Sequence, residues 1–387
     1  MSINQTIESK LRVGWLASGF WGRNGSGTGR VAVENIRALL SEPAIYEVVI
    51  LTKNKNETDG ILKIDEFKNA TVLQLPSVRG AFLSGARQYY SAKNDSRYAL
   101  DVLHFSVARL YPFFWKYPAR KFFCTFHAGG DKSVRIRKFI ISRFAFNLIA
   151  RINWRKLDAI IAVSEFGREE ISEYFKIPKS AIRVIPNGTD DFRGLTKKPI
   201  VGNEKLGRFV LILGRWQEYK NVRLPCQAIR ELNAISSAKI NILLVGNSKT
   251  TEKVLIEEEL KKHLDNIVIT ADFLSVEELA WAYAKAELVI HPSLNEGFGL
   301  PAFEAFYSGS NLLVHNKTPA SRILGREHGV GSCDMRDLNE IINAISERLD
   351  GEAISQADRE DFVVKNKLLW ADFRSRTLAM YMEQLNY

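Results

Sequence analysis

Short apolar runs alternate along this chain with longer segments in which apolar residues recur every three or four positions. The runs are rich in Val, Ile, Leu and Phe, as is typical of strands buried on both faces of a sheet. Strands are predicted at 11–18, 47–52, 71–75, 102–105, 121–126, 159–163 and 182–185 in the first half, and at 209–213, 240–245, 267–270, 288–291 and 311–314 in the second. Helical spacing predicts helices at 28–40, 222–232, 252–263, 276–284, 301–307 and 367–385.

This alternation predicts the fold class. Strands that alternate with helices form parallel sheets with right-handed crossovers, so each half should be a doubly wound, Rossmann-like α/β domain. A polar segment with Gly and Pro at 187–199 separates the halves. We therefore predict a first domain at 1–190, a second at 191–368 and a closing helical segment at 369–387. Open α/β sheets bind ligands at the carboxyl ends of their strands, which favours a site in a cleft between two facing domains.

The net charge of +10 is unevenly divided along the chain. Residues 1–195 hold 30 Lys/Arg and 18 Asp/Glu, whereas residues 196–387 hold 24 and 26. A basic first half favours an anionic partner, which could be a membrane surface, a nucleic acid or a phosphorylated acceptor. Residues 132–156 contain eight Lys/Arg and no acidic residue, interleaved with bulky apolar side chains. This stretch suggests docking on anionic lipid; the alternative is a buried helix with solvated charges.

The sequence favours a cytoplasmic protein without a bound metal. Its first ten residues are polar, and it has no run of the roughly 18 apolar residues that a membrane span needs. We expect a cytoplasmic location, with peripheral contact to the inner face of the plasma membrane through the basic half. Cys124, Cys226 and Cys333 are far apart, the histidines lack metal-ligand spacing, and Asp190-Asp191 lies in the polar segment. We therefore expect no metal and no cofactor.

The segment from His291 to Ala305 carries the clearest chemistry. A predicted strand ends near His291, a glycine-rich loop follows, and a helix opens near Pro301, a favoured residue at a first helical position. Glycines allow a close approach of the backbone, and the N–H groups of a helix start suit a diphosphate. Glu296 on the loop and Glu304 on the helix could then accept hydrogen bonds from sugar hydroxyls and from a ribose diol.

The two glutamates of this segment resemble the E-x7-E signature of the family-4 retaining glycosyltransferases, which have the GT-B architecture. The resemblance extends over nearly the whole chain. It implies two Rossmann-like domains that face each other across a cleft, the first on the acceptor side and the second binding a nucleotide sugar. It also implies that the closing helix crosses back onto the first domain.

Several other segments carry the same resemblance. After the strand at 209–213, Arg215 and Lys220 match a family pattern, and their charges could neutralise a leaving diphosphate. His127 resembles the family histidine that lies beside the donor sugar, although Ala128 stands where many relatives have an acid. The glycine-rich stretch at 25–29 resembles the family loop near the phosphates and the acceptor. Ser164, Glu165 and Asn187 lie in further family-like stretches, and the family places the nucleotide base around 270–273.

These matches give the expected site. The predicted catalytic residues are His127, Glu296, Arg215 and Lys220. The predicted donor-binding residues are Gly27, Thr28, Gly29, Asn187, Arg215, Lys220, Phe273, Gly297, Phe298, Gly299, Leu300 and Glu304. After residue 310 the chain departs from the family pattern, because Ser310 and Arg322 stand near positions where many relatives have a proline and a glutamate.

The resemblance implies a retaining hexosyltransferase that uses a UDP- or GDP-sugar. Its acceptor would be a glycan or a lipid-linked sugar, in polysaccharide, O-antigen or glycolipid synthesis. Front-side displacement, in which the leaving phosphate helps to deprotonate the acceptor, is the working hypothesis for retention. Two alternatives remain: a non-catalytic or nucleic-acid-binding basic protein, and a GT-B nucleotide-sugar epimerase. We expect no nucleic-acid partner; sugar transfer, donor hydrolysis or an epimerised donor would discriminate among the three.

Overall fold

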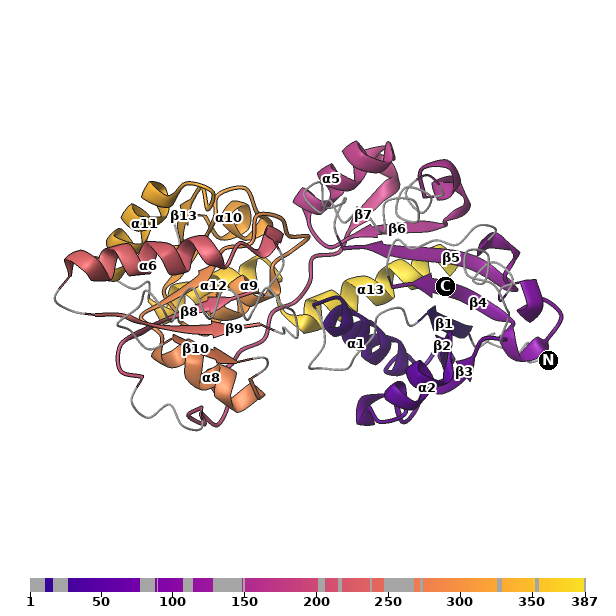
Figure 1. Ribbon diagram of the computed structural model, residues 1–387. Helices are drawn as coiled ribbons and strands as arrows, with labels where there is room; N and C mark the ends of the chain where they lie inside the picture. Colours follow the sequence, from indigo (N-terminus) through magenta and orange to yellow (C-terminus); the bar gives the residue numbers. More distant parts are fainter. Residues whose placement is uncertain are drawn as a thin grey trace. The chain divides into compact units, whose positions relative to one another are not determined.

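The computed structural model describes residues 11–16, 27–76, 88, 90–106, 114–127, 148, 150–200, 206–214, 218–236, 239–246, 268–271, 274–325, 329–351 and 355–385. They form two compact α/β units, each with its own sheet (Figure 1). The first unit contains the described residues between 11 and 187 together with those from 370 to 385. The second contains the described residues from 188 to 369.

The first unit is built on a sheet of seven parallel strands in the order β3-β2-β1-β4-β5-β6-β7. All seven strands predicted for the first half are present. They are β1 (Leu11–Leu16), β2 (Ile45–Thr52), β3 (Thr71–Gln74), β4 (Leu100–Phe105), β5 (Ala119–Phe126), β6 (Ala159–Ala162) and β7 (Ile182–Val184). The helices include α1 (Gly27–Leu40), α2 (Lys55–Ile61), α5 (Glu165–Phe175) and α13 (Trp370–Leu385).

Helix α13 completes the first unit, although it lies at the other end of the chain. It packs alongside α1 (Figure 1). Between these two helices, Arg374 Nη1 lies 2.7 Å from Glu34 Oε2. Hydrogen bonds join the ring of His104 on β4 to Tyr381 on α13 (2.5 Å) and to Thr125 on β5 (2.8 Å). Burial lowers the pKa of His104 to about 3, so its ring is neutral at pH 7.

The second unit is built on six parallel strands in the order β10-β9-β8-β11-β12-β13. They are β8 (Phe209–Leu213), β9 (Asn241–Val245), β10 (Val268–Ala271), β11 (Leu288–His291), β12 (Leu312–His315) and β13 (Gly331–Cys333). The five predicted strands are confirmed, and the pattern missed β13. The predicted helix at 252–263 lies outside the described residues, and α13 begins at Trp370 rather than at 367, because Lys367 has a left-handed φ of 52°.

The helices of the second unit cover both faces of its sheet. They are α6 (Arg223–Ile235), α8 (Val276–Lys285), α9 (Leu300–Tyr307), α10 (Pro319–Leu324), α11 (Leu338–Asp350) and α12 (Gln356–Lys365). Helices α6 and α11 lie on one face and α8 on the other (Figure 1). Alternation along β8 sets the two faces: Val210 and Ile212 join the core beneath α6 and α11, whereas Phe209 stacks on Trp281 of α8. Among the described residues, no helix combines the length and apolar character of a membrane span.

The polar segment that follows residue 187 packs on the second unit. Phe192 is buried against the ring of Tyr283, with ring centroids 5.3 Å apart. The backbone N–H of Thr189 donates to the carbonyl of Leu368 at 2.8 Å, so the segments at the two ends of this unit lie side by side.

Candidate functional site

The second sheet reverses its direction of growth between β8 and β11. From β8 the chain adds β9 and β10 on one side, and it then returns to place β11, β12 and β13 on the other. Because the connections on either side of such a switch point diverge, ligands of open α/β sheets bind outside the carboxyl ends of the strands there. Lys220 follows β8, and His291 and Glu296 lie at and after the end of β11. The sheet topology therefore brings these three residues to the expected binding edge.

The loop between β11 and α9 is held by its own residues. Gly299 precedes α9 with a φ of 92°, a conformation that L side chains rarely adopt, and Pro301 lies in the first turn of the helix. The buried hydroxyl of Ser293 donates to the carbonyl of Asn295 at 3.1 Å. The ring of Phe298 stacks on Phe303, with centroids 4.2 Å apart. This loop therefore presents Glu296 on a fixed backbone.

Lys220 meets Glu296 in an ion pair that is largely shielded from water. The Lys220 ammonium bonds Oε1 of Glu296, and the side chains are 17% and 15% exposed. The two loops are also joined through their backbones, because the N–H of Leu294 donates to the carbonyl of Tyr219 at 2.8 Å. A shielded cation at this edge is available to an incoming anion, since a phosphate can replace the carboxylate as its partner.

Glu296 is held in its ionised form. Burial alone would raise its pKa, but the Lys220 ammonium and the His291 ring, whose Nε2 lies 3.4 Å from Oε1, together lower that pKa to about 2. At neutral pH this carboxylate therefore only accepts hydrogen bonds. The sequence pattern marks His291 only as the end of a predicted strand. Its Nδ1 is buried, and no described residue hydrogen-bonds it.

Glu304 lies on α9 beside a buried tyrosine. The Tyr283 hydroxyl of α8 lies 3.1 Å from Oε2 of Glu304 and 3.4 Å from the carbonyl of Pro301, and it can donate to either acceptor. Burial, together with the charge of Glu304, raises the pKa of Tyr283. The hydroxyl therefore stays protonated and can donate a hydrogen bond. Sequence reasoning missed Tyr283, because a tyrosine within a helical pattern is indistinguishable from a core residue.

In the first unit, His127 directly follows β5. Its Nε2 donates to the carbonyl of Ser106 at 2.9 Å, and the Ser106 hydroxyl donates in turn to the carbonyl of Leu16 at 3.0 Å. Burial lowers the pKa of His127 to about 4, against the opposing effect of the Ser106 carbonyl. The ring is therefore neutral at pH 7, with Nε2 protonated and Nδ1 able to accept.

The other candidate site residues of the first unit lie in a helix turn, at a buried position and at a helix cap. Gly27, Thr28 and Gly29 form the first turn of α1. Asn187 is buried, and no described residue hydrogen-bonds its Oδ1. Ser164 caps α5, because its Oγ accepts from the N–H of Gly167 at 2.8 Å, so its position is explained by the helix.

The structure thus distributes the predicted residues over both units. Lys220, Glu296, Gly297, Phe298, Gly299, Leu300 and Glu304 belong to the second unit, and Gly27, Thr28, Gly29, His127 and Asn187 belong to the first. Arg215 and Phe273 lie outside the described residues. Across the part of the chain that the structure describes, no three His, Cys, Asp or Glu side chains gather into a group that could hold a metal ion.

Two family models match most of this chain. Residues 25–193 match the model "Glycosyltransferase Family 4", and residues 196–361 match "Glycosyl transferases group 1". The serotype-specific mannosyltransferase WbdA of Escherichia coli is 26% identical over 243 residues, which are 59% of this chain and 29% of WbdA. The O-antigen chain mannosyltransferase B of Escherichia coli is 24% identical over 229 residues, 57% of this chain and 60% of that relative.

The fold has solved relatives as well. HepE of Anabaena, crystallised with UDP-glucose, superposes with a TM-score of 0.72 at 14% sequence identity, over 96% of this chain and 100% of that one. This likeness shows the fold, and the two family models together cover most of the sequence. The chain therefore belongs to the family-4 glycosyltransferases, and its two parallel α/β units have the GT-B fold.

Proposed function

We propose that this chain transfers a hexose-type sugar from a UDP- or GDP-sugar to a glycan or lipid-linked acceptor, with retention of the anomeric configuration. The observation that carries the proposal is the shielded Lys220–Glu296 pair at the switch point of the second sheet. Glu304 lies eight positions after Glu296 and is held by Tyr283. The mannosyltransferase relatives and the UDP-glucose bound to HepE support a nucleotide-sugar donor.

In the proposed reaction, the bond between the anomeric carbon and the diphosphate oxygen breaks, and the acceptor oxygen bonds to that carbon. The acceptor proton passes to the leaving phosphate, so a nucleoside diphosphate and a glycoside are the products. Lys220 stabilises the negative charge that develops on the diphosphate, and Arg215 is proposed to share this role. Glu296 exchanges its bond to Lys220 for bonds from sugar hydroxyls, which it can accept because it is ionised.

The remaining residues are proposed to orient the donor. Carboxylate oxygens accept more than one hydrogen bond, so Glu304 can bind a ribose diol while it accepts from Tyr283. The neutral ring of His127, whose Nε2 is committed to Ser106, would orient the sugar through Nδ1 without acting as a nucleophile. The reaction is proposed to need no metal ion.

The proposal is tested with the purified chain and a panel of UDP-, GDP- and dTDP-sugars. We expect one donor class to raise the melting temperature and to release its nucleoside diphosphate, slowly by hydrolysis or faster with an acceptor glycan. Proton NMR of the product should show the anomeric configuration of the donor. A panel without any stabilised or consumed donor would overturn the proposal. Recovery of an epimerised donor would indicate an epimerase, and an inverted product would exclude retention.

A further inference from the structure

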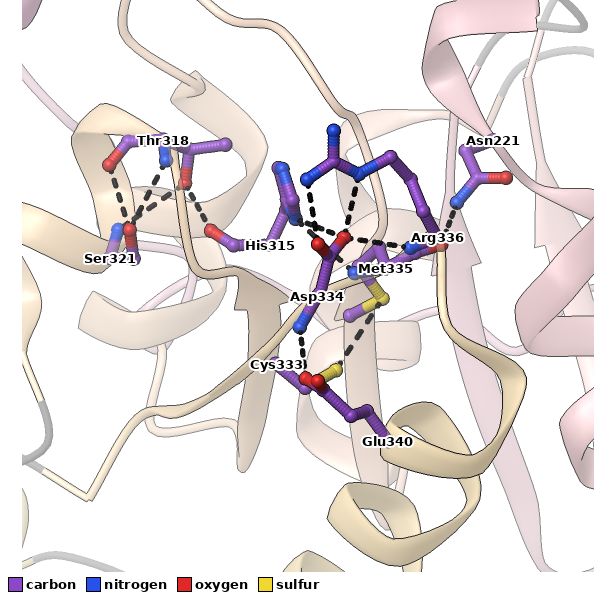
Figure 2. A network of polar contacts seen from close by, with 9 residues as sticks. All are labelled: Asn221, His315, Thr318, Ser321, Cys333, Asp334, Met335, Arg336 and Glu340. Atoms are coloured by element: carbon purple, nitrogen blue, oxygen red, sulfur yellow. Dashed lines mark hydrogen bonds and ion pairs between the residues drawn. The ribbon is translucent and has the colours of Figure 1, made fainter.

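Asn221, the residue after Lys220, has an unusual backbone and a long-range hydrogen bond. Its φ of 47° lies in the left-handed region, which Asn adopts more readily than most residues. Its backbone N–H donates to the carbonyl of Glu218 at 3.1 Å and closes the turn that carries Lys220. Its side-chain Nδ2 donates to the carbonyl of Met335 at 2.5 Å (Figure 2). The turn is thereby tied to the chain segment that follows β13.

The acceptor of this bond is itself fixed. The N–H of Met335 donates to Nδ1 of His315 at 3.2 Å, and His315 ends β12 (Figure 2). Burial lowers the pKa of His315, which keeps the ring neutral and Nδ1 able to accept. Both polar groups of the Met335 backbone are thus held, the N–H by β12 and the carbonyl by Asn221. A chain of hydrogen bonds runs from the sheet through Met335 to the turn.

The turn is also held by the loop that follows β11. Leu294 binds the carbonyl of Tyr219, and Glu296 binds the Lys220 ammonium. Gly214, which follows β8, is close-packed against the residue that follows the turn, because a Cβ on Gly214 would lie 2.7 Å from Val222 Cγ1. A lysine side chain has four rotatable bonds, so the place of its ammonium depends on how firmly the backbone beneath it is held.

We infer that Asn221 is a positioning residue, which holds the Lys220 turn against Met335 so that the ammonium meets the donor diphosphate. The inference rests on the proposed function, in which Lys220 binds that diphosphate. In this inference Asn221 acts through Lys220 and contacts no reacting group. Its effect should therefore be confined to ligands with a diphosphate and should vanish when Lys220 is absent.

The test uses Asn221→Gly, which tolerates the left-handed backbone but loses the amide. Asn366→Gly is the matched control, because its amide also donates to a backbone carbonyl, that of Phe362 at 2.8 Å, at the end of α12. Calorimetry with UDP, GDP, uridine and guanosine measures affinity. Loss of one hydrogen bond predicts about a fivefold weaker binding of the diphosphate that the wild type prefers. Nucleoside binding should not change, and the control should bind all four ligands as the wild type does.

A double-mutant cycle separates positioning from general destabilisation. With Lys220→Ala already present, Asn221→Gly should change diphosphate affinity by less than about twofold. If Asn221→Gly does not fold, Asn221→Asp replaces it, because its carboxylate has the same shape but cannot donate to Met335. A fivefold loss that persists without Lys220, or unchanged binding by both Asn221 variants, would overturn the inference. If Lys220→Ala itself leaves UDP and GDP binding unchanged, the proposed function fails and the inference with it.

Discussion

The Glu296 carboxylate joins three side chains into one unit at the edge of the second sheet. It accepts from Lys220 and lies 3.4 Å from His291. A buried ion pair is costly to break, because the remaining charge is left in a poorly solvated place. We therefore expect the pair to stay formed until a ligand supplies an alternative partner to each member. The proposed diphosphate sugar would do so, with anionic oxygens for the lysine and hydroxyls for the carboxylate.

Removal of the lysine charge should slow transfer rather than merely weaken binding. Loss of one charge-assisted donor to a developing anion predicts about a hundredfold lower kcat for Lys220→Ala. Lys220→Arg should retain the ion pair and have an intermediate rate. Lys121→Ala, which removes an exposed ion pair with Asp158, is the control and should behave as wild type. Arg215→Ala should resemble Lys220→Ala. Steady-state kinetics measures these rates. EDTA should leave the wild-type rate unchanged. If chelation abolished activity and Mg²⁺ restored it, a metal ion would be neutralising the leaving diphosphate instead of these side chains.

The two glutamates should separate kinetically. If Glu304 binds the ribose, Glu304→Gln should raise the donor KM several-fold with little change in kcat, whereas Glu296→Ala should mainly lower kcat. Tyr283→Phe removes the hydroxyl that holds Glu304 and should shift KM in the same direction as Glu304→Gln. Tyr98→Phe, which loses a 2.8 Å bond to the carbonyl of Gln74, is the control. Wild-type KM and kcat in all of the glutamate variants would remove both residues from the site.

At the level of elements, local sequence predicted the strands and the helix that carries Glu304, because each has a strong pattern of its own. Strand β13 was missed, since Gly331, Ser332 and Cys333 include no β-branched or aromatic residue. Its pairing with β12 fixes it instead, and glycine fits there without strain: a Cβ on Gly331 would lie 2.8 Å from the Arg348 side chain, which would have to shift. Such a strand depends on its neighbours, which a single-sequence pattern does not contain.

The contact between β4 and α13 predicts a dependence of stability on pH. Folding lowers the pKa of His104 from its ordinary value of about 6.5 to about 3. Between these values the unfolded chain binds more protons, so stability rises with pH and falls on acidification. From pH 7.5 to pH 5, His104 should account for a loss of about 2 kcal/mol in the free energy of unfolding. Urea titrations of His104→Gln should show a correspondingly smaller loss, and an equal loss in both proteins would refute the assignment.

At the scale of the whole molecule, the sequence located the charged residues of the site but not the residues that hold them. Lys220 and Glu296 follow strands in recognisable motifs. Tyr283 lies 21 residues before Glu304, and Asn221 lies 114 residues before its acceptor Met335. These partners meet only after the sheet has formed. A local motif therefore identifies the side chain that would do the chemistry. The residues that hold this side chain in place can be identified only from the tertiary structure.

The basic first half leads to a prediction about membranes. Leu148 and Ile152 are 44% and 62% exposed, and the neighbouring residues Arg151, Arg155 and Lys156 of the sequence are exposed as well. We propose that this patch contacts anionic lipid, each basic residue near the surface contributing about 1 kcal/mol. Flotation at low salt should show binding to vesicles with phosphatidylglycerol and little to neutral vesicles. Arg151→Glu with Arg155→Glu should weaken it; negligible binding of the wild type to both vesicle types would dismiss the idea.

The place of α13 in the first unit has a consequence for biosynthesis. Strands β1–β7 leave the ribosome long before α13 is translated, so Glu34 and His104 must wait for Arg374 and Tyr381. The described residues of the second unit all lie between 188 and 369, so this unit can fold as that stretch emerges. In the nascent chain, the second unit should therefore complete its fold before the first unit does. The first unit should stay incomplete, and accessible to chaperones and proteases, until residues 370–385 have been synthesised.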